Sequence, residues 1–182
     1  MLEVIAGVMG AGKTWLLYKK VTDAKLMGKN VQIFAYPVHD GQVVSRIGFK
    51  SEAITVYTVA EIESTLEPNV DLIAIDDAQL FNKRDLLGFC NRWRNKIHII
   101  IAGLQLDCFG ENFGAVVELM GRAEYVTVLL AVCEKCKEQT AIVSQRYRDL
   151  QHTIPITKDD PRIELRKDYY APSCWKCFIP PT

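Results

Sequence analysis

The sequence predicts an α/β fold, in which a parallel sheet flanked by helices precedes a small C-terminal unit with two cysteine pairs. A glycine-rich motif ending in Lys13-Thr14 lies between an apolar run and a stretch of helical spacing. Apolar segments then alternate with helical segments as far as Val132, which is typical of a parallel sheet covered on both faces. From Cys133 onward the segments are short and polar. We therefore expect two units, residues 1–132 and 133–182.

The expected elements follow from apolar spacing and from the residues that end them. Gly28 ends the first helix and Pro37 closes the second strand, because glycine favours a helix C-terminus and proline lacks the donor that a strand needs. Residues 39–50 are polar, contain glycine and are expected to form a loop. The expected strands are 2–6, 31–36, 54–57, 70–75, 97–104 and 125–132, and the expected helices are 13–27, 59–66, 82 or 83 to 95, and 113–121.

Composition limits the class of protein and of partner. The chain has 182 residues, 49% of them hydrophobic, and 22 basic residues balance 22 acidic ones. That length suits one domain with a small appendage, and the balanced charge creates no field that would attract nucleic acid or an anionic membrane. No apolar run reaches the ~20 residues that cross a bilayer, and Met1 leads into a strand without a signal peptide. We expect a cytoplasmic protein.

Residues 7–14, Gly-Val-Met-Gly-Ala-Gly-Lys-Thr, have the G-x-x-x-x-G-K-T pattern of a P-loop between strand and helix. Its glycines let backbone N–H groups surround phosphate oxygens, and the helix N-terminus adds partial positive charge. Lys13 is expected to reach the β- and γ-phosphates of ATP, and the Thr14 hydroxyl to ligate Mg²⁺. The alternative is a chance match in a glycine-rich turn. The fold is thus expected to be P-loop NTPase-like, with a RecA-like sheet.

Two carboxylates follow the strand expected over residues 70–75. Asp76 is expected to hold Mg²⁺ at the strand end, although an Asp there can also cap a turn. Neighbouring strand residues point to opposite sides, so Asp77 is expected to face away from the metal. It could there take the proton of a substrate hydroxyl as general base. The alternative for Asp77 is a solvated loop acid.

The cysteines predict a metal site. Cys133/Cys136 and Cys174/Cys177 form two C-x-x-C pairs, and four thiolates suit a closed, structural Zn²⁺ site. Redox use of either pair is the alternative. Cys90 and Cys108 stand alone and are expected to be small buried hydrophobes.

Together these features resemble the thymidine kinase family of the mammalian-cytosolic and bacterial kind. The resemblance covers nearly the whole chain. Besides the P-loop it rests on Asp-Asp-Ala-Gln-Leu-Phe at 76–81, the segments at 102–104 and 110–114, Leu-Ala-Val-Cys-Glu-Lys-Cys at 130–136, Ser-Gln-Arg at 144–146, and Tyr170 four residues before Cys174. It implies a P-loop domain with a zinc-bearing lasso domain, ATP and Mg²⁺ as cofactors, a nucleoside substrate and a homo-oligomer, often a tetramer.

The resemblance also implies roles for particular residues. Asp77 and Lys13 would be catalytic. The nucleotide-binding residues would be Gly7, Met9, Gly10, Ala11, Gly12, Lys13, Thr14, Asp76 and Gln79. The substrate-binding residues would be Met9, Asp40, Leu80, Leu104, Cys108, Phe113, Ile163, Leu165 and Tyr170. Asp107 also matches the family pattern.

The chain departs from the family pattern at several of these positions. Asp77 stands where the family has its catalytic Glu, and the loop at 36–42, Tyr-Pro-Val-His-Asp-Gly-Gln, keeps the family's Asp but lacks its Lys and Arg. Leu80 and Cys108 replace aromatic residues, and Leu165-Arg166 replaces Gly-Gly. In the family, the Lys and Arg that this chain lacks would stabilise charge on the transferred phosphoryl group. The Gly-Gly pair that it lacks would let the lasso backbone approach the base.

The leading hypothesis is therefore ATP-dependent phosphorylation of the 5′-hydroxyl of a deoxynucleoside, with thymidine as the first candidate. Two alternatives remain open: a divergent, non-catalytic nucleotide-binding protein, and a kinase of a different, modified pyrimidine. Retention of Lys13, Thr14 and Asp76 favours catalysis, whereas the changed positions favour divergence.

Overall fold

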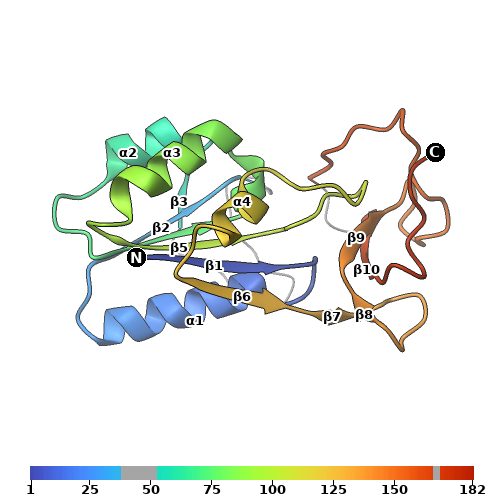
Figure 1. The fold of residues 1–182 in the computed structure, drawn as a ribbon, viewed down its shortest axis with the longest axis horizontal. Coiled ribbons are helices and arrows are strands. Elements are labelled where there is room, and N and C mark those ends of the chain that lie inside the picture. Colours follow the sequence, from blue (N-terminus) through green and yellow to red (C-terminus); the bar gives the residue numbers. More distant parts are fainter. Residues whose placement is uncertain (38–52, 166–168) are drawn as a thin grey trace.

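The computed structural model describes residues 1–37, 53–165 and 169–182, and its main body is a six-stranded sheet between helices (Figure 1). The strand order is β3-β2-β4-β5-β1-β6, and each recorded pair of neighbours is parallel. The predicted α/β fold with a parallel sheet is confirmed. The strands are β1 (Leu2–Gly7), β2 (Val31–Ala35), β3 (Ile54–Thr55), β4 (Leu72–Asp76), β5 (His98–Gly103) and β6 (Tyr125–Leu129).

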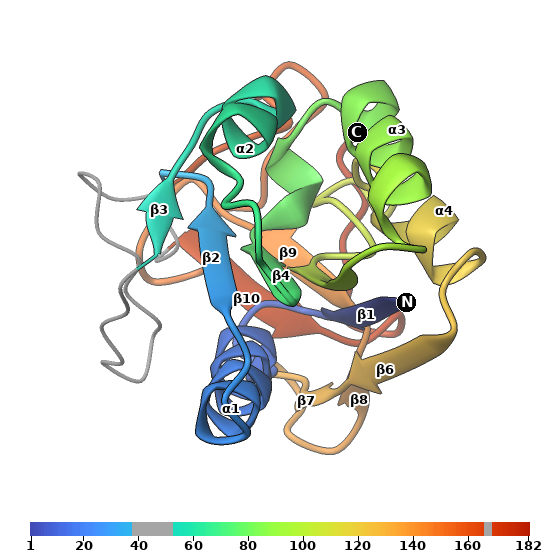
Figure 2. The same ribbon diagram turned by 90° about the vertical axis from the view of Figure 1, so that its left-hand side faces the viewer.

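Helices cover both faces of this sheet. Figure 2 shows α1 (Lys13–Leu26) on one face, with α2 (Val59–Thr65), α3 (Lys83–Trp93) and the short α4 (Val116–Met120) on the other. None of the helices in the described part of the chain combines the length and the apolarity that crossing a membrane requires.

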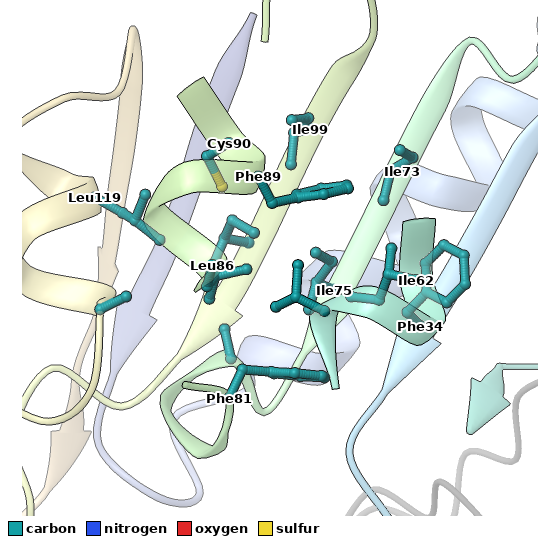
Figure 3. Packing of buried hydrophobic residues seen from close by; sticks show 14 of the residues in the cluster. Phe34, Ile62, Ile73, Ile75, Phe81, Leu86, Phe89, Cys90, Ile99 and Leu119 are labelled. Atoms are coloured by element: carbon teal, nitrogen blue, oxygen red, sulfur yellow. The ribbon is translucent and has the colours of Figure 1, made fainter. Parts of the chain in front are cut away.

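Strand β4 shows why the sheet needs continuous apolar runs. Ile73 and Ile75 pack into the cluster beneath α2 and α3, together with Phe34, Ile62 and Phe89 (Figure 3). Their neighbours Leu72 and Ala74 pack on the other face, in the cluster that contains residues of α1. Because successive strand residues point to opposite faces, both sets must be apolar. Each fully buried Ile or Leu contributes about 1.5–3 kcal/mol relative to an exposed one.

Side-chain caps set where two of the helices begin. Thr58 Oγ1 accepts from the Glu61 N–H at 3.2 Å, and the Glu61 carboxylate accepts from the Tyr57 N–H at 2.8 Å. This reciprocal pair satisfies N–H groups that have no partner within the helix, so α2 starts at Val59. Asn82 caps α3 with one bond, its side chain accepting from the Asp85 N–H.

Two antiparallel pairs follow the main sheet, β7 (Ala131–Val132) with β8 (Thr140–Ala141), and β9 (Val143–Arg146) with β10 (Tyr170–Ser173). Figure 1 shows that these two pairs lie beyond the carboxyl ends of the main strands.

Two expected elements differ most from the structure, and the strand expected over 54–57 is limited to β3. The strand expected over 125–132 is two strands, because pairing with β1 ends at Leu129 and Ala131 pairs with Ala141 instead. The helix expected over 113–121 is confined to α4. Gly114, which has a left-handed φ of 56°, precedes the start of α4.

Candidate active site

The P-loop motif forms the turn between β1 and α1. Gly12 has φ 91° and ψ 16°, a left-handed conformation that favours glycine, and it directly precedes the helix. No side chain caps α1, and phosphate is a ligand well suited to uncapped N–H groups at a helix N-terminus. The Lys13 side chain is nearly buried and folds back over the loop, where its Nζ donates to the Val8 carbonyl at 2.8 Å. The loop therefore has the backbone form and the cation that phosphate binding requires.

Asp76 and Asp77 are not neighbours on a strand, which corrects the expectation from sequence. Strand β4 ends at Asp76, whereas Asp77 has φ 50° and ψ 39° and directly precedes the short 3₁₀ turn η1 (Ala78–Leu80). The alternation of strand side chains therefore does not set the direction of Asp77. The buried Asp76 carboxylate accepts from the Asp77 N–H at 2.9 Å. Aspartate is among the residues that tolerate this left-handed conformation, which suits Asp at a position where the family pattern has Glu.

Gln79 joins Asp77 to the end of β5. Its Nε2 donates to Asp77 Oδ1 at 3.2 Å, and its Oε1 accepts from the Leu104 N–H at 3.0 Å. The side chain is buried, so these bonds form in a medium where each counts for more than in water.

A single pocket brings together almost all of the predicted substrate residues. It encloses about 460 Å³ of space, part of it open to solvent. Asp77 and Gln79 also line it. Of the nine predicted contacts only Asp40 is missing, since it lies outside the described residues, as do Gln42 and Arg166. The predicted contacts that line the pocket are Met9, Leu80, Leu104, Cys108, Phe113, Ile163, Leu165 and Tyr170.

The pocket also contains Arg162, which the sequence reasoning missed. Its guanidinium bonds Asp107 Oδ2 at 2.9 Å and Glu111 Oε2 at 2.6 Å, and it lies over the Phe109 ring at 4.7 Å. Asp107 is buried, and its other oxygen accepts from the N–H groups of Phe109 and Glu111. Only the fold brings Arg162 to Asp107, because no motif links these distant positions. Ser144 and Glu164 complete the polar lining that sequence analysis did not assign.

Buried neutral groups hold the C-terminal segment over the pocket. The Tyr170 hydroxyl donates to the Glu164 carbonyl at 3.0 Å, and the Cys108 thiol donates to the Arg162 carbonyl at 3.3 Å. Burial raises the pKa of Tyr170 and raises the pKa of Cys108 to about 11. Cys108 is therefore a neutral thiol at physiological pH, as expected for a small buried hydrophobe, and not a nucleophile.

The four predicted metal ligands converge. The Sγ atoms of Cys133, Cys136, Cys174 and Cys177 all lie within 4.8 Å of one another, and all six cysteines of the chain are free. Sulfur atoms at ~2.3 Å from a tetrahedral Zn²⁺ lie ~3.8 Å apart, close to the 4.0 Å between Cys136 and Cys174. The donor set thus fits zinc.

Backbone groups prepare one of these thiols for a metal. Burial alone would raise the pKa of Cys133, but the N–H groups of Cys136, Cys174 and Lys135 donate to it and lower its pKa to about 6. Burial and the neighbouring sulfur atoms raise the pKa of Cys177 to about 12. Because a thiolate is the form that binds metal, these N–H groups favour the metal-binding form of Cys133.

The cysteine cluster also packs on the P-loop. Val8 is buried against Cys133 and Cys174, with Ala11 alongside. The Met9 N–H donates to Ser144 Oγ at 3.0 Å. The structure therefore links the segment that carries the cysteines to the P-loop motif as well as to the pocket.

Comparisons with known proteins relate the chain to one family. The family model described as thymidine kinase matches residues 1–178. Curated thymidine kinases from two strains of Chloroflexus aurantiacus, J-10-fl and Y-400-fl, are each 33% identical to this chain over 187 aligned positions. Each alignment covers 98% of this chain and 94% of the relative.

Proposed function

The chain belongs to the thymidine kinase family, and from this premise we propose that it transfers the γ-phosphate of ATP to the 5′-hydroxyl of thymidine. Family membership makes the chain a nucleoside kinase and disfavours the non-catalytic alternative. The observation that supports the specific proposal best is the pocket in which Asp77 lies beside eight predicted nucleoside contacts. The pocket lies at the carboxyl edge of the parallel sheet, where ligands of such folds bind.

In the proposed reaction each residue at this edge has one task. Lys13 binds the β- and γ-phosphates, while Thr14 and Asp76 would hold Mg²⁺, which neutralises phosphate charge when bound. The 5′-oxygen bonds to the γ-phosphorus as the bond to the β–γ bridging oxygen breaks, and ADP leaves. Asp77 accepts the proton of the hydroxyl and later releases it to water.

We propose one structural Zn²⁺ per chain on Cys133, Cys136, Cys174 and Cys177. The converging sulfur atoms support it, and four protein ligands leave no open position for catalysis. Its role would be to order the segment between the two cysteine pairs. That segment supplies Ile163, Leu165 and Tyr170 to the pocket.

We propose a homo-oligomer in the cytoplasm, a tetramer by family resemblance, with no nucleic-acid or membrane partner. The edge strand β6 supports association, because Tyr125, Val126 and Val128 are exposed on it. Sedimentation equilibrium measures the assembly directly.

The acceptor is tested by turnover with ATP, Mg²⁺ and a panel of natural and 5-substituted pyrimidine nucleosides. Leu80 and Cys108 replace aromatic residues of the family pattern, and this difference favours a modified pyrimidine as the second candidate. We expect the highest kcat/KM for thymidine. A higher value for a 5-substituted analogue would assign the second candidate instead.

Lys13→Ala is expected to weaken ATP binding at least 100-fold, because it removes the ammonium that faces the phosphates. Isothermal titration calorimetry measures this. The control is Lys19→Ala on the same helix, whose ammonium pairs with Asp23 at an exposed site. Equal ATP affinity of wild type and Lys13→Ala would contradict the P-loop assignment.

A further inference from the structure

We propose that Gln79 is a positioning residue that holds the Asp77 carboxylate in place for proton removal. The inference rests on the proposed role of Asp77 as general base. It gives Gln79 a task different from the nucleotide contact expected from sequence.

The hydrogen bonds of Gln79 fix the orientation of its amide. The Leu104 N–H can only donate, so the atom that faces it at 3.0 Å must be the amide oxygen. The amide NH₂ must then face Asp77, whose Oδ1 lies 3.2 Å from Nε2. A flipped amide would lose the bond to Leu104 and place an oxygen against the carboxylate. The chain therefore presents a donor, and not an acceptor, to Asp77.

Two glycines from separate segments make room for this side chain. A Cβ at Gly103 would lie 2.8 Å from Gln79 Oε1, and a Cβ at Gly114 would lie 2.6 Å from the Gln79 carbonyl oxygen. Contacts this short do not occur, so any other residue at either position would displace Gln79. Gln79 is itself only 5% exposed. It is thus held by packing as well as by hydrogen bonds.

Gln79 ties the base to the wall of the substrate pocket. Asp77, Gln79 and Leu104 all line that pocket, and Gln79 connects the turn after β4 to the end of β5. A general base must lie within about 2.6–3.2 Å of the oxygen whose proton it takes. A misplacement of about 1 Å can cost roughly 100-fold in rate, so an anchored carboxylate matters for the transfer step.

Gln79→Glu tests this role because it changes one contact and keeps the other. The new carboxylate still accepts from the Leu104 N–H, but it faces Asp77 with an oxygen that repels it. We expect kcat to fall at least tenfold, while the KM and the calorimetric Kd for ATP change less than about twofold. The matched control is Gln32→Glu. Gln32 is equally buried, and it too accepts from one backbone N–H, but its Nε2 donates to the Thr65 carbonyl, far from the pocket, instead of to a carboxylate. Its kcat should stay at the wild-type value.

The same substitution in an Asp77→Asn background separates positioning from general damage. If Gln79 acts through Asp77, Gln79→Glu should change the residual radiolabel transfer of Asp77→Asn less than about twofold. An equal loss in both backgrounds, or an unchanged kcat in the single variant, would overturn the inference. An Asp77→Asn variant with wild-type transfer would instead overturn the proposed base, and with it the role of Gln79.

Thermal unfolding identifies a variant that fails to fold. Gln79→Asn then replaces Gln79→Glu, because it keeps the same amide groups but shortens the reach by about 1.5 Å. Asparagine cannot contact both Asp77 and Leu104. Gln79→Asn should therefore lower kcat at least tenfold in the otherwise wild-type protein, and should leave the residual transfer of Asp77→Asn nearly unchanged. A loss of the same size in both backgrounds would overturn the inference here too.

Discussion

Asp77→Asn is expected to lower phosphoryl transfer by roughly 10²–10⁴-fold while ATP binding stays within about twofold of wild type. The amide has the size of the carboxylate but cannot take the proton of the acceptor hydroxyl. Single-turnover transfer from γ-labelled ATP measures the chemical step. The control is Asp71→Asn. Asp71 precedes β4, at the end of that strand opposite to Asp77, and its carboxylate accepts from the Asn30 N–H. Transfer by Asp77→Asn at the wild-type rate would show that Asp77 is not the base.

Asp77→Glu is expected to lower transfer as well, although less than Asp77→Asn. Its carboxylate can still take a proton, but the added methylene moves the group by about 1.5 Å and breaks the contact with Gln79 Nε2. Glutamate is also less suited than aspartate to the left-handed conformation of this residue. A rise in kcat would show that the shorter side chain limits the reaction.

Cys174→Ser is expected to remove zinc and to unfold the C-terminal unit, because apparent binding energies of structural zinc are about 10–16 kcal/mol and act as folding energy. Nucleoside binding should be lost, since Tyr170 in β10 lines the pocket four residues away. ATP binding should also weaken, because Val8 of the P-loop packs on Cys133 and Cys174.

Metal analysis and thermal unfolding measure these effects. The control is Cys90→Ala, which removes a buried thiol of the main core and should keep one zinc per chain. Purified wild type without zinc, with four free thiols at the predicted ligands, would contradict the zinc site. Zinc retained at one per chain in Cys174→Ser would contradict Cys174 as a ligand.

Much of the fold was accessible from the sequence because local signals and tertiary packing agree. The strands β1, β4 and β5 place apolar residues on both faces of the sheet, and Thr58 and Asn82 mark helix starts by a local capping mechanism. The division between β6 and β7 was not accessible. The apolar run from Tyr125 to Val132 is continuous, and only the partner strands decide where the chain leaves the main sheet.

In the site, too, features with a local sequence signal could be predicted, and features that depend on tertiary contacts could not. The glycine-rich turn before α1 and the convergence of the cysteine pairs could be predicted because motif spacing encodes their geometry. The left-handed turn at Asp77 could not, because aspartate also occurs at strand ends with ordinary backbone angles. The contacts of Arg162 with Asp107, and of Gln79 with Leu104, join segments distant in sequence, and no local sequence pattern predicts them.

The central claim is transfer of the γ-phosphate of ATP to the 5′-hydroxyl of thymidine, and product analysis with two thymidine analogues tests it most directly. Wild-type protein is incubated with ATP and Mg²⁺, and with thymidine, 3′-deoxythymidine or 5′-deoxythymidine. We predict a monophosphate of thymidine and of 3′-deoxythymidine, which keep the 5′-hydroxyl, and no product from 5′-deoxythymidine, which lacks it. Phosphorylation of 5′-deoxythymidine, or no transfer to thymidine at all, would contradict the account.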